Sequence, residues 1–212
     1  MQNILCLSYG KDSIACLGAI EQLGWSLDRI VHVEIWATES IPADLPPMVA
    51  FKEKADEIIK ERWEIEVEHI RSRDTYEDCF YRICGNCGRA STSKRAGSIY
   101  GWPHQRGPWC NSRLKQHTLE KLSKNARYYI GIAADEPERF HVLGENKISP
   151  LVEAGWTERD CWAFDEQNGN RGLRRMCILA WRTMGNEPTW GRNRNLQTGR
   201  VANILFSPLF VL

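Results

Sequence analysis

Apolar runs of strand length alternate with segments of helical periodicity along the first 165 residues. Runs rich in Val, Ile, Leu and Tyr predict strands at 4–7, 29–37, 64–70 and 127–133. Apolar residues that recur every three or four positions predict helices at 14–23, 49–62, 112–122 and 155–164. A short extended segment at 147–152 precedes the last helix, for which Thr157 and Asp160 form a predicted cap.

The order of these elements predicts the class of fold. Strands that alternate with helices favour an α/β protein with a doubly wound, Rossmann-like parallel sheet and helices on both faces. Sequential right-handed connections fit a strand order of about 3-2-1-4-5. Ligands of such folds bind beyond the carboxyl ends of the strands where the winding direction switches, which here are the first and the fourth.

Two segments break this regularity. Residues 71–108 contain glycines, arginines, three cysteines and several aromatic residues without a sustained period, which is typical of a functional or mobile insert. From Gly169 onward the chain has seven arginines and no lysine, and it is again aperiodic. We therefore expect one domain at 1–165, with the insert inside it, and an atypical arginine-rich tail at 166–212. Our hypothesis is that the tail arose by frameshift or replacement, which comparison of the alternative reading frames of the coding DNA would test.

The overall charge is nearly balanced. The 28 Lys and Arg residues offset 27 Asp and Glu residues, so the net charge of +1 does not by itself favour nucleic acid as a ligand. No apolar run approaches the roughly 18 residues that a membrane-spanning helix needs, and the N-terminus has no signal-peptide pattern. We expect a cytoplasmic protein without a membrane partner.

The segment 8–13, SYGKDS, lies between the first strand and the first helix. Gly10 permits a tight turn and a close approach of a ligand to the backbone. The first N–H groups of a helix have no partner within it and favour an anion, and Lys11 adds a positive charge. Asp12 would repel a phosphate unless it caps the turn or holds Mg²⁺. The pattern favours a phosphate-binding loop, with an ordinary capped turn as the alternative.

Several of the eight cysteines are candidates for chemistry. Cys-x₂-Cys followed by a distant Cys is a known ligand spacing for Zn²⁺ or an iron–sulfur cluster. The four candidate ligands, for which free thiols in a loop are the alternative, are Cys79, Cys84, Cys87 and Cys110. Cys110 is also a candidate nucleophile, because the start of a helix favours a thiolate. Cys6 and Cys16 lie in an apolar strand and an apolar helix, so we expect both in the core.

Two further groups could contact an anion. Arg139 follows the fourth strand and could hold a phosphate or sulfate bidentately, while Asp135 or Glu136 could orient a ribose hydroxyl or a metal. An internal ion pair on a surface loop is the alternative. Arg113 and Lys115 lie at the start of the third helix, where cations oppose the helix dipole unless an anion is nearby. For these two, a solvated basic face is the alternative.

Four motifs resemble those of a known family. SYGKDS, at 8–13, resembles the Ser-x-Gly-Lys-Asp-Ser loop of the adenine nucleotide alpha-hydrolase, or PP-loop, superfamily. GPWCNSRLK at 107–115, YYIGIAADEPERF at 128–140 and KISPLVEAGWTERDC at 147–161 resemble motifs of the phosphoadenosine phosphosulfate (PAPS) reductase-like proteins, in the same order. Together the matches span most of the predicted domain.

The resemblance implies a parallel α/β sheet and an enzyme that binds ATP, PAPS or adenylyl sulfate for adenylyl or sulfonucleotide chemistry. It implies that Lys11 and Cys110 are catalytic and that the segment 37–39 passes near the adenosine. The phosphates would lie on Ser8, Gly10, Lys11, Asp12 and Ser13. Further binding residues would be Arg113, Lys115, Asp135, Glu136 and Arg139.

The chain departs from the reductases in one respect. Reductases of this family use a mobile C-terminal cysteine in a Glu-Cys-Gly-Leu-His context, and the late cysteine of this chain is Cys177 in a different context. ATP-dependent sulfur transfer to, or modification of, tRNA or DNA is therefore an alternative. Four basic residues could then meet the nucleic acid backbone: Arg89, Lys94, Arg95 and Arg106. A non-catalytic nucleotide-binding protein is a third hypothesis, and a homodimer is compatible with each.

Overall fold

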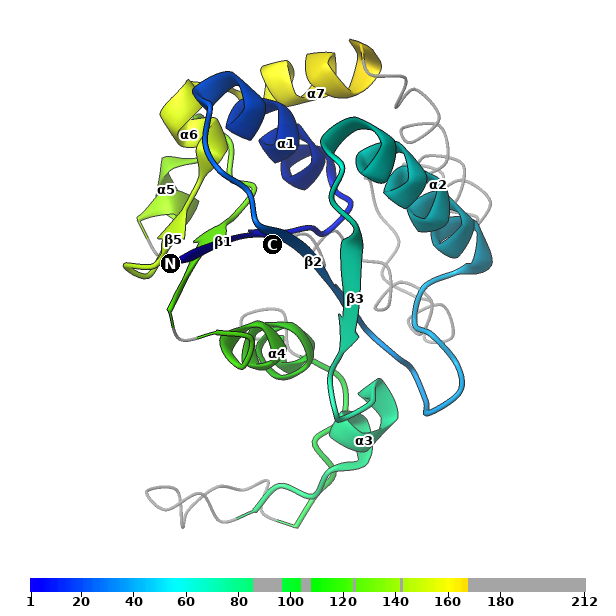
Figure 1. Cartoon of the computed structure of the whole chain (residues 1–212). Helices are drawn as coiled ribbons and strands as arrows, with labels where there is room; N and C mark the ends of the chain where they lie inside the picture. The colour runs from blue at the N-terminus through cyan, green and yellow to red at the C-terminus, as the bar shows by residue number, and fades with distance from the viewer. Residues whose placement is uncertain (86–96, 104–107, 124, 142, 168–212) are drawn as a thin grey trace, which may run out of the picture. The chain divides into compact units, whose positions relative to one another are not determined.

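Five parallel strands form the sheet of the computed structural model, which describes residues 1–85, 97–103, 108–123, 125–141 and 143–167. The strands are β1 (Gln2–Cys6), β2 (Arg29–Glu34), β3 (Val67–Arg71), β4 (Ala126–Tyr129) and β5 (Lys147–Ile148). Their order across the sheet is β3-β2-β1-β4-β5, and helices pack against it (Figure 1). The predicted class of fold, an α/β protein with a parallel sheet of order 3-2-1-4-5, is therefore confirmed.

The position of β1 in the middle of the sheet determines which loops lie next to each other. β1 pairs with β2 in the register Ile4↔Arg29 and with β4 in the register Ile4↔Tyr128. Ile4 and Leu5 point to opposite faces of the sheet and both are fully buried. The winding direction reverses at β1, so the loops that follow β1 and β4 leave the same edge of the sheet side by side.

The helices of the described residues vary in length and in the way they begin and end. They are α1 (Lys11–Leu23), α2 (Pro46–Trp63), α3 (Tyr76–Tyr81), the π-helix η1 (Cys110–Gln116), α4 (His117–Glu120), α5 (Pro137–Phe140), α6 (Pro150–Ala154) and α7 (Glu158–Gln167). α1 ends at Gly24, whose left-handed φ of 63° suits a glycine. The predicted cap of α7 is confirmed, because Asp160 Oδ2 accepts from the Thr157 N–H at 2.8 Å and Thr157 Oγ1 accepts from the Asp160 N–H at 3.4 Å. Among the described residues, no helix combines the length and the apolar character that crossing a membrane requires.

The chain divides into two compact units. The first comprises residues 1–32 and 45–68 and the chain from 125 onward, and the second comprises residues 33–44 and 69–124. The predicted insert lies in the second unit. The predicted tail lies almost entirely outside the described residues, so the division of the chain at residue 165 stays a prediction.

The second unit contains a helix that the sequence pattern did not predict. α3 lies inside the segment 71–108, so the expectation that this segment is irregular throughout is wrong. Thr75 and Asp78 form a capping box, with the Thr75 N–H donating to Asp78 Oδ2 at 2.8 Å and the Asp78 N–H donating to Thr75 Oγ1 at 3.2 Å. At six residues the helix is too short for a periodic apolar pattern.

In the first unit, α7 packs closely against α1. Gly18 makes this contact possible, because a Cβ at this position would lie 2.2 Å from the ring of Phe164. Cys16 and Cys161 are fully buried between the two helices, and Cys6 is also buried in the core. The prediction that Cys6 and Cys16 are core residues is confirmed. The packing sets the first turn of α7 beside the start of α1.

Candidate phosphate-binding site

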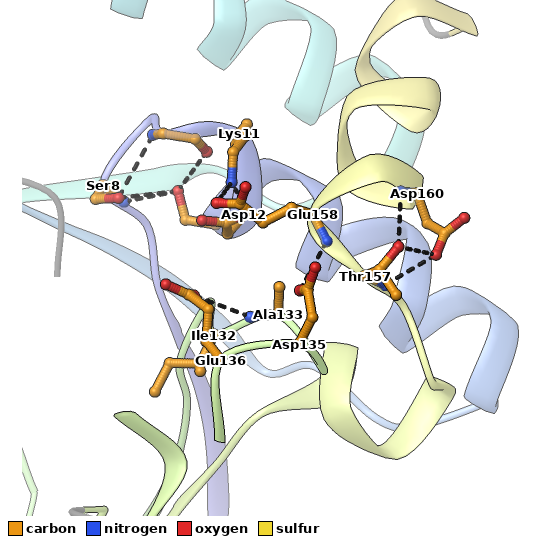
Figure 2. Close-up of polar contacts among 12 residues, drawn as sticks. Ser8, Lys11, Asp12, Ile132, Ala133, Asp135, Glu136, Thr157, Glu158 and Asp160 are labelled. Carbon is orange, nitrogen blue, oxygen red and sulfur yellow. Dashed lines mark hydrogen bonds and ion pairs between the residues drawn. The ribbon is translucent and has the colours of Figure 1, made fainter. Parts of the chain in front are cut away.

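The loop between β1 and α1 is closed by two serine hydroxyl groups. Ser13 Oγ accepts hydrogen bonds from the Ser8 N–H at 3.2 Å and from Ser8 Oγ at 3.1 Å, and it donates to the Gly10 carbonyl at 2.9 Å (Figure 2). The two hydroxyl groups predicted to bind phosphate therefore hold each other and the backbone. They fix the shape of the loop in the absence of a ligand.

The left-handed residue of the loop is Tyr9 rather than Gly10. Tyr9 has φ 59°, whereas Gly10 has φ −78° and ψ 160°, a conformation that any residue adopts. The expectation that Gly10 supplies the conformational freedom for the turn is therefore wrong. Gly10 instead precedes the first helical residue as the N-cap of α1, where it has no side chain to cap the helix.

The N-terminus of α1 presents backbone donors at this loop. The first hydrogen bond of the helix runs from the Ile14 N–H to the Gly10 carbonyl at 3.1 Å. The N–H groups of residues 11–13 precede that bond, and such groups have no acceptor within a helix. The N-terminal end of a 13-residue helix also carries a partial positive charge, which stabilises an anion.

Lys11 is held beside these N–H groups by two carboxylates. Its Nζ lies 2.6 Å from Asp12 Oδ1 and 2.9 Å from Glu158 Oε1 (Figure 2). It also lies 5.7 Å from the centre of the Trp162 ring. Burial alone would lower the pKa of Lys11, but the hydrogen bonds and charges of Asp12 and Glu158 outweigh it, and the net pKa is raised. Lys11 is therefore positively charged at neutral pH.

Asp12 is buried, with 4% of its surface exposed, in spite of its charge. The Lys11 ammonium compensates this carboxylate. Burial, followed by the charge of Asp12, raises the pKa of the Cys161 thiol to about 12, so the neighbouring sulfur stays protonated. Asp12 thus pairs with Lys11, and no group of three or more metal-ligating side chains is gathered among the described residues.

The loop after β4 approaches the start of α1 through a glycine. A Cβ at Gly131 would lie 2.7 Å from the Ser13 amide nitrogen and 2.8 Å from the Asp12 carbonyl carbon. Both neighbours are backbone atoms, so any residue with a side chain would displace the helix start. The prediction that the loops after the first and fourth strands meet is confirmed by this contact.

The acidic residues of the loop after β4 form hydrogen bonds with the backbone of that loop, with Arg139 and with α7. Asp135 Oδ1 accepts from the Glu158 N–H at 3.0 Å, which connects this loop to the first turn of α7 (Figure 2). Arg139 donates to both carboxylate oxygens of Glu136, at 2.7 and 2.8 Å. The internal ion pair therefore forms through a single nitrogen of the guanidinium group, Nη1, and a phosphate contact of Arg139 stays a prediction.

The predicted site residues belong to both units. Eight of them lie in the first unit: Ser8, Gly10, Lys11, Asp12, Ser13, Asp135, Glu136 and Arg139. Those of the second unit are Arg113, Lys115 and the four cysteines. Arg113 lies in η1 with its guanidinium carbon 5.5 Å from the centre of the Tyr100 ring, a cation–π contact within the second unit. Whether Arg113 and Lys115 bind an anion stays a prediction.

Cys110 begins the π-helix η1 and is 4% exposed. Burial raises the pKa of its thiol above the ordinary value, and the amides of Asn111 and of Cys110 itself, together with the charge of Lys115, offset only part of that effect. The net direction is opposite to the thiolate that a helix start favours. Burial wins because its contribution is the largest of these. As described, Cys110 is a protonated thiol.

The four-cysteine metal site also stays a prediction. Cys79 is buried and Cys84 is partly exposed, whereas Cys87 lies outside the described residues. Burial raises the pKa of Tyr76 to about 12, with smaller contributions from Cys110 and Cys79, so both thiols lie near this hydroxyl group. The basic residues proposed to meet a nucleic acid, and Cys177, also lie outside the described residues.

The sequence analysis missed a polar network behind the loop. The Tyr9 hydroxyl donates to Asp56 Oδ1 of α2 at 2.5 Å, and Lys52 of the same helix donates to His32 Nε2 at 2.8 Å. His32 is buried, with 5% of its surface exposed, and both of its ring nitrogens are hydrogen-bonded. The available signal was an aromatic residue in a loop otherwise made of small and charged residues.

Comparison of the chain with protein-family models, with curated proteins and with solved structures finds no match. The interpretation of the site therefore depends on its own geometry. That geometry is the N-terminus of a 13-residue helix, a charged lysine in its first turn, and two adjacent loops at the point where the sheet reverses its winding direction.

Proposed function

We propose that the loop between β1 and α1 binds the phosphates of an adenine nucleotide, which is ATP, PAPS or adenylyl sulfate. The observation that carries the proposal is the combination of Lys11 with the N-terminus of α1 at the switch point of the sheet. Lys11 supplies a full charge and the N–H groups supply fixed donors, so a phosphate gains both without a rearrangement of the backbone. The closed loop is already shaped for it.

The enzyme we propose is PAPS reductase-like and carries out adenylyl or sulfonucleotide chemistry. Both reactions place additional negative charge on phosphate or sulfate oxygens as a bond to phosphorus or sulfur breaks. Lys11 and the amides of α1 would stabilise that charge, because they are oriented before the reaction begins. Mg²⁺ could accompany a polyphosphate. The four cysteines could instead hold Zn²⁺ or an iron–sulfur cluster, as the sequence analysis proposes.

The acceptor thiol is the less supported part of this proposal. A sulfur atom attacks as the thiolate, and Cys110 is buried with a raised pKa. If Cys110 is the reacting thiol, substrate binding must expose and deprotonate it. Adenylation of an acceptor does not require a thiol, and the described site supports this chemistry more directly.

A panel of nucleotides tests the proposal. ATP, PAPS, adenylyl sulfate and adenosine are titrated into the purified chain by isothermal calorimetry, with metal analysis of the same sample. We expect at least one of the phosphate compounds to bind more tightly than adenosine. Lys11→Ala should weaken that binding about 30-fold, because it removes a charge-assisted hydrogen bond.

Lys60→Ala is the matched control. Lys60 is an exposed lysine of the first unit whose ion pair with Glu66 lies on α2 and its neighbouring turn. This variant should bind the nucleotide as the wild type does. Equal affinity of Lys11→Ala and wild type, or the absence of binding to every adenine nucleotide, would refute the proposed function. Tight binding with no turnover on any acceptor would favour the non-catalytic alternative, and salt-sensitive binding of tRNA or DNA would favour nucleic acid modification.

A further inference from the structure

Tyr9 holds an unusual position in the phosphate loop. It is the second residue of SYGKDS, it has the left-handed φ of 59°, and only 4% of its surface is exposed. A residue with a Cβ is disfavoured in this conformation, because the Cβ approaches the following carbonyl oxygen. Such a residue persists only where the surrounding structure holds it. The contacts of the Tyr9 side chain must therefore compensate for the backbone conformation.

Four residues of β2 and α2 contact the Tyr9 side chain. The Tyr9 hydroxyl donates to Asp56 Oδ1 at 2.5 Å. Its ring packs edge-on against His32, with centres 4.7 Å apart, and against Phe51, with centres 6.2 Å apart. The Lys52 Nζ lies 5.4 Å from the centre of the Tyr9 ring, within the range of a cation–π contact. The side chain thus points away from the anion-facing surface of the loop and into the space between the sheet and α2.

The residues beside Tyr9 are held from the same side. His32 Nδ1 lies 2.8 Å from the Leu7 carbonyl, which can only accept, so Nδ1 carries the proton and donates. His32 Nε2 is then the acceptor for Lys52 Nζ at 2.8 Å. The Leu7 N–H donates to the Val31 carbonyl at 2.9 Å. The chain entering the loop is fixed at Leu7 by two hydrogen bonds and at Tyr9 by its side chain.

We propose that Tyr9 is the positioning residue of the phosphate loop. By connecting the loop to Asp56 of α2, it holds residue 9 in the left-handed conformation and so keeps the N-terminus of α1 open toward the ligand. The inference rests on the proposed function, because it concerns how the loop binds phosphate. It adds a residue that touches no ligand and acts through the backbone of Gly10 and Lys11.

The inference predicts that loss of Tyr9 affects binding of the phosphates of the ligand differently from binding of its adenosine. If Tyr9 positions the N–H groups of α1, its loss weakens binding of groups that these donors contact and leaves the binding of adenosine unchanged. If Tyr9 only fills the core, its loss lowers stability and affects all ligands alike. The ratio of ATP affinity to adenosine affinity therefore reports positioning, and a thermal unfolding curve reports packing.

The test compares two tyrosines that each lose only a hydroxyl group. Tyr9→Phe removes the bond to Asp56. Tyr129→Phe removes a bond to the Ser26 carbonyl, at 3.2 Å, from an equally buried tyrosine of β4 that lies outside the loop. We expect Tyr9→Phe to weaken ATP binding about tenfold with unchanged adenosine binding, since a hydrogen bond to a charged group is lost. We expect Tyr129→Phe to keep wild-type affinity for both ligands.

Two further variants test the contact between Tyr9 and Asp56 in other ways. Asp56→Asn keeps a partner for the hydroxyl group but removes its charge, so it should weaken ATP binding by less than Tyr9→Phe does. Tyr9→Gly adopts a left-handed φ without strain but has no side chain to anchor, so it should bind ATP at least as weakly as Tyr9→Phe. Wild-type ATP affinity in Tyr9→Gly would overturn the inference, since the anchor would then be dispensable.

The failure of the inference can be told apart from the failure of the proposed function. If the wild type binds ATP through Lys11 and Tyr9→Phe binds it as tightly as Tyr129→Phe, the inference alone falls. If the wild type binds no phosphate compound, both fall together. Isothermal calorimetry of ATP and adenosine on the intact chain, with unfolding curves for every variant, gives both answers.

Discussion

α1 and η1 each begin with a residue that the sequence predicts to be catalytic, but the side chains of the two residues differ in charge. At α1 the residue is Lys11, whose pKa is raised by Asp12 and Glu158, so it is more firmly charged. At η1 the residue is Cys110, whose pKa is raised by burial, so it is more firmly neutral.

The backbone geometry follows the same contrast. The residue before α1, Gly10, is extended, and the N–H groups of residues 11–13 precede the first hydrogen bond of the helix. The residue before η1, Trp109, is already helical and buried. A helix start binds an anion only where the chain leaves the N–H groups open and a charge remains near them. At α1 the charged Lys11 lies at the helix start, whereas at η1 the charge of Lys115 only partly offsets the burial of Cys110.

The largest effect that we expect is that of Gly131→Ala, which tests how tightly the loop after β4 packs against the start of α1. Gly131→Ala should lower the free energy of unfolding by about 3 kcal/mol, since its Cβ would meet the backbone of residues 12 and 13. Nucleotide binding should be lost in the fraction that remains folded. Denaturant unfolding measures the first effect and calorimetry with ATP the second.

Gly144→Ala is the control for this prediction. Gly144 lies in a loop of the same unit, and the nearest atom to its added Cβ is the side-chain oxygen of Asn146 at 3.8 Å, an ordinary contact. This variant should unfold within about 0.5 kcal/mol of the wild type. If Gly131→Ala unfolds at the same denaturant concentration as the control, the two loops are not packed as tightly as the contact implies.

The second prediction concerns the neutral state of Cys110. Iodoacetamide reacts with thiolates, so at pH 8 Cys110 should be alkylated about tenfold more slowly than a cysteine of the unfolded chain. Its rate should continue to rise above the ordinary thiol pKa of about 8.5. Because the folded-state pKa is raised, Cys110 stabilises the fold most below that ordinary value, and this contribution is lost as the pH rises through the folded-state pKa.

Cys84 serves as the internal reference for this measurement, because it lies in the same unit and is partly exposed. Mass spectrometry of the alkylated peptides should show modification of Cys84 before Cys110. Alkylation of Cys110 first would contradict the contrast between the two helix starts. Addition of a nucleotide that speeds the reaction of Cys110 would show that binding exposes the thiol.

The smallest effect that we expect is a gain in the affinity for ATP. Glu158→Gln removes one of the two carboxylates on Lys11, so a phosphate no longer competes with Glu158 for the ammonium group. The affinity for ATP should rise about threefold, because Glu158 is half exposed and solvent screens the pair. Calorimetry at low and at high salt should show the gain shrinking as the salt concentration rises.

Glu66→Gln is the matched variant, since Glu66 forms an exposed ion pair with Lys60 away from the loop. It should leave the affinity for ATP unchanged. An equal gain in both variants would indicate a general effect of net charge. A loss of affinity in Glu158→Gln would indicate that Glu158 holds Lys11 in its binding position rather than competing with the ligand.

Much of the fold was predictable from local pattern. The apolar character of β1, β2 and β4 and the helical periodicity of α1 and α2 are properties of consecutive residues, and parallel order follows from their alternation. The short elements were not predicted, because α3, α5 and α6 each have six residues or fewer and contain less than two helical turns. For α3, the Thr75 and Asp78 capping pattern was a readable signal.

The residues of the candidate site were predicted from the sequence, but the long-range contacts between them were not. The sequence placed Lys11, Asp12 and Arg139 near a switch point, and that position depends only on the order of the strands. It left open whether Arg139 forms an internal ion pair, which the structure shows with Glu136 three residues earlier. It did not reveal that Glu158 reaches Lys11 from a helix 147 residues later, because that pair depends on how α7 packs against α1 and no local pattern encodes this distance.

The sequence by itself determined the α/β class and the strand order, because both follow from local periodicity and the handedness of connections, and it placed the candidate phosphate loop after the first strand. Only the tertiary structure decided the state of the charged and reactive groups. The pKa of Lys11 is raised in spite of burial because Asp12 and Glu158 pair with it, and Cys110 is neutral because burial removes it from water. Tyr9 is left-handed while β2 and α2 hold its side chain. The pairs Lys11–Glu158 and Tyr9–Asp56 join residues far apart in the chain, which only folding brings together.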